Sequence, residues 1–154
     1  MWWRRVRYVL LLAALCAIAT CPAAKRSCTS KNRTVEAEQL LAYLAEKVTL
    51  SYLANGKLPQ GASLTPRPSC CDQGGTCEPD ASTWAQPGWV ALGFSIDDEY
   101  RYSYEYTPDP SGTFATLRAI GDVDCDGKSS LHEVKLTING GTVLQAWTET
   151  DPNE

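Results

Sequence analysis

The residues best suited to chemistry are three carboxylates spaced two apart and followed directly by Gly127. This spacing matches a twelve-residue calcium loop, in which hard oxygens surround the ion and the glycine makes a sharp turn. A backbone carbonyl and a later carboxylate would complete the coordination. The candidate metal ligands are therefore Asp122, Asp124, Asp126, Lys128 through its carbonyl, and Glu133.

Three features of this segment depart from a helix-flanked calcium loop. Ser129 occupies a position where an aliphatic side chain normally packs, Cys125 lies inside the loop, and both flanks read as strands. We therefore expect either a Ca²⁺ loop between two strands or an Asp-rich turn whose carboxylates face water. Clustered carboxylates repel one another, so a cation would stabilise either arrangement.

No other pattern indicates catalysis. His132 is the only histidine, and because no Ser or Cys motif accompanies it, we predict a surface histidine at the start of a strand rather than a general base. Tyr100, Tyr102, Tyr104 and Tyr106 could stack a ligand, although such a stripe is more typical of a packed sheet face. We predict no catalytic residue, no cofactor-binding residue and no enzymatic activity.

Cysteines are abundant, with seven in 154 residues and no repeated C-x-x-C pattern, which favours disulfides in an oxidising compartment over a zinc cage. The segment 58–88 is rich in Pro, Gly and Ser and needs such crosslinks. We expect two bridges among four residues, one of them joining this loop to the turn at residue 125. The alternative is one bridge and two buried thiols. The candidates are Cys70, Cys71, Cys77 and Cys125.

A helix must precede this loop, because residues 34–54 carry one apolar stripe at helical spacing. The Asn55-Gly56 pair and Pro59 would end it. Most of the charged residues in this segment lie off the stripe, as expected for a helix with one face in water. The stripe consists of Ala37, Leu40, Leu41, Leu44, Ala45 and Val48.

Strands are predicted across residues 89–148 as an antiparallel meander, with Asn139-Gly140-Gly141 as a strong hairpin signal. The expected fold class is thus α+β, with the helix laid across one face of the sheet. The expected strands are Trp89–Phe94, Tyr100–Tyr106, Thr113–Ile120, Glu133–Ile138 and Thr142–Thr148.

The N-terminal segment 1–24 has the pattern of an export signal or membrane anchor, with three arginines before an uncharged run from Tyr8 to Ala24. Cleavage after Ala23 or Ala24 is one expectation, and a lipoprotein signal ending at Cys21 is another. Residues 25–154 would form one globular domain. The net charge of -4 argues against a nucleic-acid partner.

The order of several segments resembles type IV pilin-like proteins of myxobacteria and related bacteria: AEQLLAYLAEKVTLSYLANGKLPQGASLTP, PSCCDQGGTCEPD, WAQPGWVALGF, DDEYRYSYEY and GDVDCDGKSS. This resemblance implies a pilin-like fold, with a long N-terminal helix packed on an antiparallel sheet. It also implies other pilin or pseudopilin subunits as partners. The start departs from the family, because Trp2 to Arg7 replaces the short leader that ends in glycine.

Two functional hypotheses follow. The first is a non-enzymatic pilin-like subunit of a type IV pilus or type II secretion pseudopilus, or a membrane-anchored pilin-like envelope protein. Its localisation would be the bacterial cell envelope, with the N-terminal segment in the inner membrane and the domain in the periplasm, or an extracellular pilus. The alternative is a secreted or periplasmic calcium-dependent binding module freed by cleavage.

Overall fold

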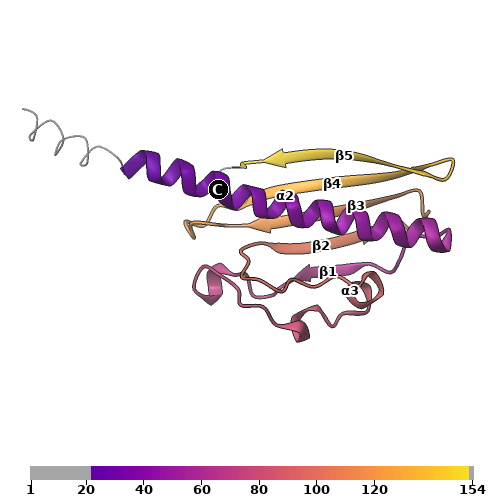
Figure 1. Cartoon of the computed structure of the whole chain (residues 1–154), viewed down its shortest axis with the longest axis horizontal. Coiled ribbons are helices and arrows are strands. Elements are labelled where there is room, and N and C mark those ends of the chain that lie inside the picture. Colours follow the sequence, from indigo (N-terminus) through magenta and orange to yellow (C-terminus); the bar gives the residue numbers. More distant parts are fainter. Residues whose placement is uncertain (1–21, 153–154) are drawn as a thin grey trace, which may run out of the picture.

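The computed structural model describes residues 22–152, with side chains from residue 34 onward, and Figure 1 shows a sheet crossed on one face by a helix. The helix α2 spans Pro22–Asn55. The strands are β1 (Ala62–Thr65), β2 (Ser103–Pro108), β3 (Phe114–Gly121), β4 (Ser130–Asn139) and β5 (Thr142–Thr150). The connection from β1 to β2 contains η1 (Cys71–Gln73), η2 (Ala81–Trp84) and the helix α3 (Pro87–Leu92).

The sheet has five antiparallel strands in the order β1-β2-β3-β4-β5. Four strands predicted within residues 100–148 are confirmed as β2 to β5. The hairpin predicted at Asn139-Gly140-Gly141 is confirmed as well, because Asn139 pairs with Thr142 across a two-residue loop. Strand β1 lies in the segment that was expected to be loop.

The strand predicted at Trp89–Phe94 is wrong, because this segment forms the helix α3 and its C-cap. Pro87 stands in the first turn, where its missing N–H costs nothing, and Gly93 adopts φ +58° at the C-cap. The apolar run alone could not separate a short buried helix from a buried strand. The flanking Pro and Gly carried the signal for a helix.

The predicted fold class, a pilin-like fold with a long N-terminal helix packed on the sheet, is contradicted. The structure is a five-stranded antiparallel sheet, and the buried side chains that α2 contributes to the core come from residues 37–48. Residues 25–33 are almost entirely polar and basic in sequence, so they have no apolar stripe to lay on a sheet. Among the residues whose side chains the structure describes, the part of α2 that packs on the sheet is therefore residues 37–48.

The helix stripe and the sheet form the core. The predicted helix positions Ala37, Leu41, Leu44, Ala45 and Val48 are all buried, and Leu40 packs against them. They meet inward-facing residues of the central strands, which alternate along each strand as a half-covered sheet requires. The strand residues buried in this way include Tyr104, Tyr106, Leu117, Val134 and Leu136.

A cluster of aromatic rings joins the β1–β2 connection to the sheet. Trp84 contacts Trp89 and Phe94 edge-on, with ring centroids 5.6 and 5.3 Å apart. The indole N–H of Trp89 donates to Oγ1 of Thr65 at 2.9 Å, which holds α3 against β1. This bond satisfies the buried polar atom of Trp89. The irregular connection is thus a packed part of the domain.

An ion pair ties α2 to the segment before β2. Oε1 of Glu36 accepts a hydrogen bond from the backbone N–H of Arg101 at 2.7 Å, and Oε2 lies 3.4 Å from Nη1 of Arg101. Burial raises the pKa of Glu36, and the hydrogen bonds and charge of Arg101 act in the opposite direction. The desolvation of the Glu36 carboxylate therefore outweighs the stabilisation that Arg101 provides.

The expected export signal or anchor falls mostly on residues 1–21, which lie outside the described residues. Among the helices that the structure describes, none combines the length and the apolar composition needed to cross a membrane.

Candidate functional site

The aspartate loop connects β3 to β4 and is organised by its own backbone. Oδ1 of Asp122 accepts the backbone N–H of Asp126 at 3.1 Å, and Oδ2 accepts that of Gly127 at 2.8 Å. The chain can turn back in this way because Cys125 adopts φ +61° and Gly127 adopts φ +93°, a region that favours glycine. The first carboxylate of the series thus closes the loop.

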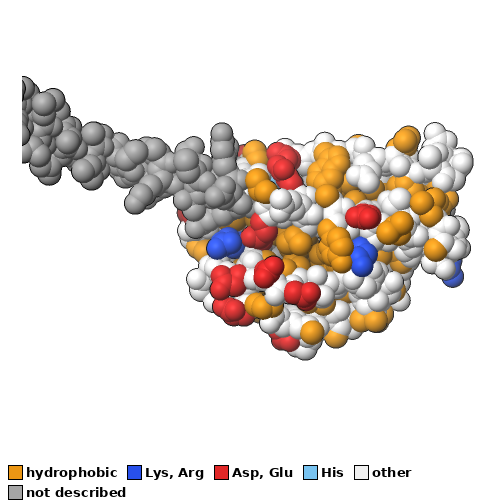
Figure 2. Space-filling view, viewed as in Figure 1, with side chains coloured by type: hydrophobic (Ala, Val, Ile, Leu, Met, Phe, Trp, Pro, Cys, Tyr) orange, Lys and Arg blue, Asp and Glu red, His pale blue; other side chains and the backbone are white. Residues whose placement is uncertain are grey.

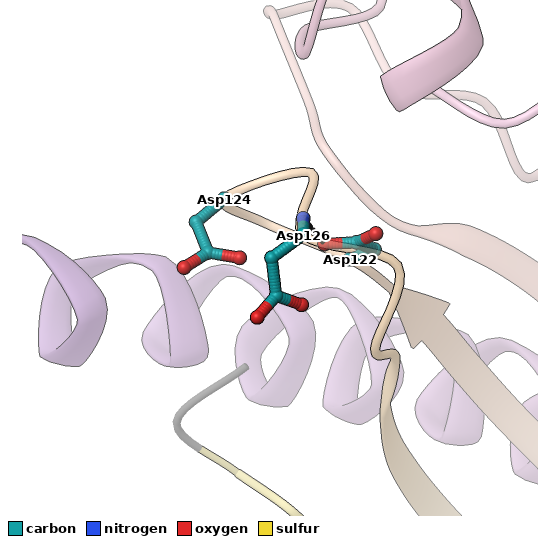
Figure 3. A group of neighbouring side chains, drawn as sticks. All are labelled: Asp122, Asp124 and Asp126. Atoms are coloured by element: carbon teal, nitrogen blue, oxygen red, sulfur yellow. Dashed lines mark hydrogen bonds between the residues drawn. The ribbon is translucent and has the colours of Figure 1, made fainter.

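Three carboxylates converge in this loop, as predicted from their spacing. One oxygen from each of Asp122, Asp124 and Asp126 lies within 4.8 Å of the others, and Figure 3 shows the side chains of Asp124 and Asp126 next to each other. Asp122 is half-buried, whereas Asp124 and Asp126 are exposed. Three hard oxygens at this separation could contact one Ca²⁺ or Mg²⁺ ion.

Lys128 supplies a competing positive charge. Its Nζ lies 3.5 Å from Oδ2 of Asp126, and its backbone N–H donates to Oδ1 of the same residue at 2.9 Å. The ammonium therefore relieves part of the repulsion between the carboxylates without a metal ion. An exposed pair of this kind contributes little to stability.

Glu133 lies apart from the three aspartates. Its Oε2 accepts a hydrogen bond from Nε of Arg118 at 2.8 Å, and Arg118 also lies 3.8 Å from a carboxylate oxygen of Glu105. The pKa of Arg118 is raised chiefly by the hydrogen bond that its guanidinium donates to Glu133. The reason is strand geometry, because Glu133 pairs with Arg118 across β3 and β4 rather than facing the loop. The spacing from Asp122 to Glu133 would bring Glu133 to the ion only if a helix followed the loop, and here a strand follows it.

Both disulfides predicted among the four candidate cysteines are present. Cys70 is bonded to Cys77, and Cys71 is bonded to Cys125. The second bridge joins the β1–β2 connection to the aspartate loop, as expected. Of the two neighbouring cysteines, Cys70 closes a small loop within the β1–β2 connection, and Cys71 anchors the aspartate loop.

His132 is buried rather than exposed, so the predicted surface histidine is wrong. Its ring lies edge-on to Tyr102, with centroids 5.6 Å apart, and Nδ1 lies 3.7 Å from Oε1 of Glu149. Within the described part of the chain, neither ring nitrogen has a hydrogen-bond partner. The missed signal was the alternation of Ser130, His132 and Val134, which places all three on the helix-covered face.

The tyrosine stripe is a packing surface and not an exposed platform for a ligand. Tyr100, Tyr102, Tyr104 and Tyr106 are all buried, which confirms the packed-face interpretation. Burial raises the pKa of the Tyr104 hydroxyl well above its usual range, so this side chain stays neutral.

A second feature, which sequence reasoning missed, is a shallow groove between α2 and β5. It is lined by Glu38, Gln39, Ala42, Trp147 and Glu149. Trp147 is 42% exposed although it lies on the helix-covered face of the sheet, opposite the buried Val134. Trp147 is the one large exposed apolar side chain among the residues that line this groove.

Comparisons with protein-family models, with curated proteins and with solved structures each gave no match. Evidence for function therefore comes from the aspartate loop, the disulfides and the exposed apolar side chains.

Proposed function

We propose that the protein is a non-enzymatic structural subunit of the cell envelope, which assembles with other subunits into a pilus or a secretion pseudopilus. The observation that carries this proposal is the set of large apolar side chains exposed on α2 and β5. Figure 2 shows hydrophobic side chains along the helix-covered face. The large apolar side chains exposed on these two elements are Val35, Tyr43, Leu50 and Leu53 on α2, Trp147 on the helix-covered face of β5 and Leu144 on the opposite face of β5.

The two disulfides support placement of the domain outside the cytoplasm, because such bonds persist in oxidising compartments. The basic and then apolar N-terminal sequence supports export through the inner membrane. A subunit role needs surface that assembly would bury, and Leu50 and Leu53 at the end of α2 are 56% and 60% exposed. Monomeric soluble proteins rarely leave such residues grouped.

Fractionation of cells that express the tagged full-length chain tests this proposal. We expect the protein in the membrane fraction and in structures sheared from the surface, and quantitative release as soluble protein would contradict it. The variant Leu50→Ser with Leu53→Ser should shift the chain from the sheared to the soluble fraction. Val90→Ser is the matched control, because Val90 is equally apolar and 66% exposed but lies on α3.

A secreted calcium-dependent binding module is the second candidate, and the convergence of three aspartates favours it. In this case Ca²⁺ would hold the loop that Cys125 anchors, and the neighbouring surface would bind a partner only when the ion is present. A chelator would then lower both the melting temperature and partner binding, since a ligand that binds only the folded state stabilises it.

A further inference from the structure

Strand β5 is an open edge of the sheet. It is the last strand in the order, and Figure 1 shows no described element beyond it. Eight of its nine residues are exposed and Val143 is half-buried. In the described part of the chain β4 is its only strand partner, so one side of its backbone faces solvent.

The opposite edge of the sheet is protected by side-chain hydrogen bonds. Strand β1 has only four residues, and the side chain of Gln86 bonds to it along the edge. Oε1 of Gln86 accepts the backbone N–H of Ser63 at 3.0 Å, and Nε2 donates to Oγ1 of Thr65 at 2.8 Å. A short, capped edge resists pairing with another chain.

Apart from the single charge of Glu149, strand β5 lacks the usual protective features of an edge. Its sequence TVLQAWTET contains no Lys, Arg or Pro, and its register with β4 runs without a bulge from Asn139–Thr142 to Leu131–Thr150. Long, regular and partly apolar edges are templates for a further strand. The geometry of β5 therefore permits pairing with a further strand.

The register shows which backbone groups are available. Because Asn139 and Thr142 flank a two-residue hairpin loop, they form a hydrogen-bonded pair, and the even-numbered residues of β5 point their N–H and C=O groups toward β4. The odd-numbered residues Val143, Gln145, Trp147 and Glu149 point theirs outward. These residues could form the ladder to a partner strand.

We infer that a second copy of this chain pairs with β5 through its own β5, antiparallel and centred on Ala146. In this register Gln145 lies opposite Trp147 of the second copy and Val143 opposite its Glu149, so every outward-facing pair can exchange hydrogen bonds. All nine residues of both strands are used. The result is one continuous sheet of two copies.

Charge favours a second copy in this orientation. Glu149 is the only charged residue of β5, and antiparallel pairing places it beside Val143 at the far end of the partner strand. Parallel pairing would bring the two Glu149 side chains together and repel them. Two copies of β5 are thus complementary to each other in the antiparallel orientation and not in the parallel one.

Packing favours the same register. The two Trp147 side chains would be diagonal neighbours across the two-fold axis, a distance that aromatic rings bridge. Each would cover part of the other, and the groove between α2 and β5 would gain a wall from the second copy. The pairing therefore accounts for the exposure of Trp147.

This inference rests on the proposed function, because it names the partner and the element for the proposed assembly. Its test uses the purified full-length chain and two variants that each add one cysteine to the seven of the natural sequence. In the inferred register the Ala146 residues of the two copies face each other as a non-hydrogen-bonded pair, with their Cα atoms about 4.5 Å apart. Ala146→Cys should therefore form a covalent dimer under mild oxidation, with the 146–146 bond mapped by mass spectrometry.

Leu144→Cys is the matched control, because residues 144 and 146 lie on the same strand and the same face. The two residues at position 144 would be about 13 Å apart along the strands, too far for a disulfide. Dimer formation by Ala146→Cys alone supports the register. Equal crosslinking of both variants, or no crosslinking above the unaltered chain, overturns it.

A second measurement compares the solution mass of the unaltered chain with that of Trp147→Lys. We expect the mass of a dimer for the former and of a monomer for the latter, with the far-ultraviolet circular dichroism unchanged, because an edge lysine blocks strand pairing. A monomeric unaltered chain, or a dimer that survives Trp147→Lys, contradicts the inference.

The two proposals fail in different ways. Retention in sheared structures without the 146–146 crosslink would keep the subunit role and overturn the β5 pairing. Crosslinking of a chain that is released entirely as soluble protein would keep the pairing and overturn the subunit role.

Discussion

Cys71 and Cys125 are joined by a disulfide although they lie 54 residues apart in the chain. The bond connects the start of η1 to the middle of the aspartate loop, between Asp124 and Asp126. It therefore restricts the carboxylates directly, and it closes the larger of the two disulfide loops in the described structure.

Removal of this bond should lower stability markedly. We expect Cys71→Ala with Cys125→Ala to reduce the free energy of unfolding by about 4 kcal/mol, because a closed loop of this length restricts the unfolded chain. Urea denaturation under non-reducing conditions measures the change. In reducing buffer the variant and the unaltered chain should converge, and a cost below about 1 kcal/mol would contradict the chain-entropy argument.

The aspartate loop predicts a specific response to chelation. If Ca²⁺ saturates the site at about a hundred times its Kd, the ion adds about 2.7 kcal/mol of stability. Chelator should then lower the Tm of the unaltered chain by about 5–10 °C. Asp124→Ala should abolish this shift, because it removes one of the three converging carboxylates.

Asp98→Ala is the control for that experiment, since it removes the same charge from an exposed position elsewhere. It should keep the full response to chelator. An unaltered chain whose Tm does not respond to chelator carries no stabilising ion in the loop.

Glu36 should make stability fall as pH rises. Burial raises the pKa of its carboxyl above 4.5, so the folded state holds the proton more tightly than the unfolded state. The contribution of Glu36 to the free energy of unfolding is greatest below pH 4.5, and it is lost as the pH rises through the pKa of the folded state. Glu36→Gln should flatten this decline, as measured by urea denaturation across a pH series.

The low end of this pH series serves as the reference for the comparison of Glu36→Gln with the unaltered chain. At about pH 4 the carboxyl is largely protonated in both states, so the variant and the unaltered chain should be closest there. Parallel slopes for the two proteins at higher pH would show that Arg101 compensates the burial of Glu36 completely.

The helix register can be tested by one buried leucine and one exposed leucine of α2. Leu44 is fully buried, and Leu44→Ala should cost about 2–5 kcal/mol through lost contacts and a cavity. Leu50 is 56% exposed, so Leu50→Ala should change stability by no more than about 0.5 kcal/mol. Thermal or urea unfolding of both variants measures the difference, and equal costs would place the packed face elsewhere.

Local patterns predicted much of the fold. The helical face around Leu44 follows from apolar spacing, which depends only on the geometry of one helix. The hairpin at Gly140-Gly141 follows from the positive φ angles that both glycines adopt. The carboxylate cluster is equally local, since the first and last aspartates are four residues apart in one turn.

Predictions failed where long-range packing decides the outcome. The apolar run predicts a strand at Trp89, although Trp89 lies on the buried face of a helix that packs against the aromatic cluster and β1. Glu133 was assigned to the metal site, although its cross-strand partner is Arg118. The sequence predicts a surface position for His132, although α2 covers that face of β4.

The sequence by itself determined the helix, the strands of the meander, the four paired cysteines and the spacing of the three aspartates, because each depends on neighbours within a few residues. Only the tertiary structure decided which cysteine bonds to which, which face of β4 is covered, and that β5 is left open beside β4. These relationships arise when the helix and the sheet pack, so they depend on contacts between segments that are distant in the chain.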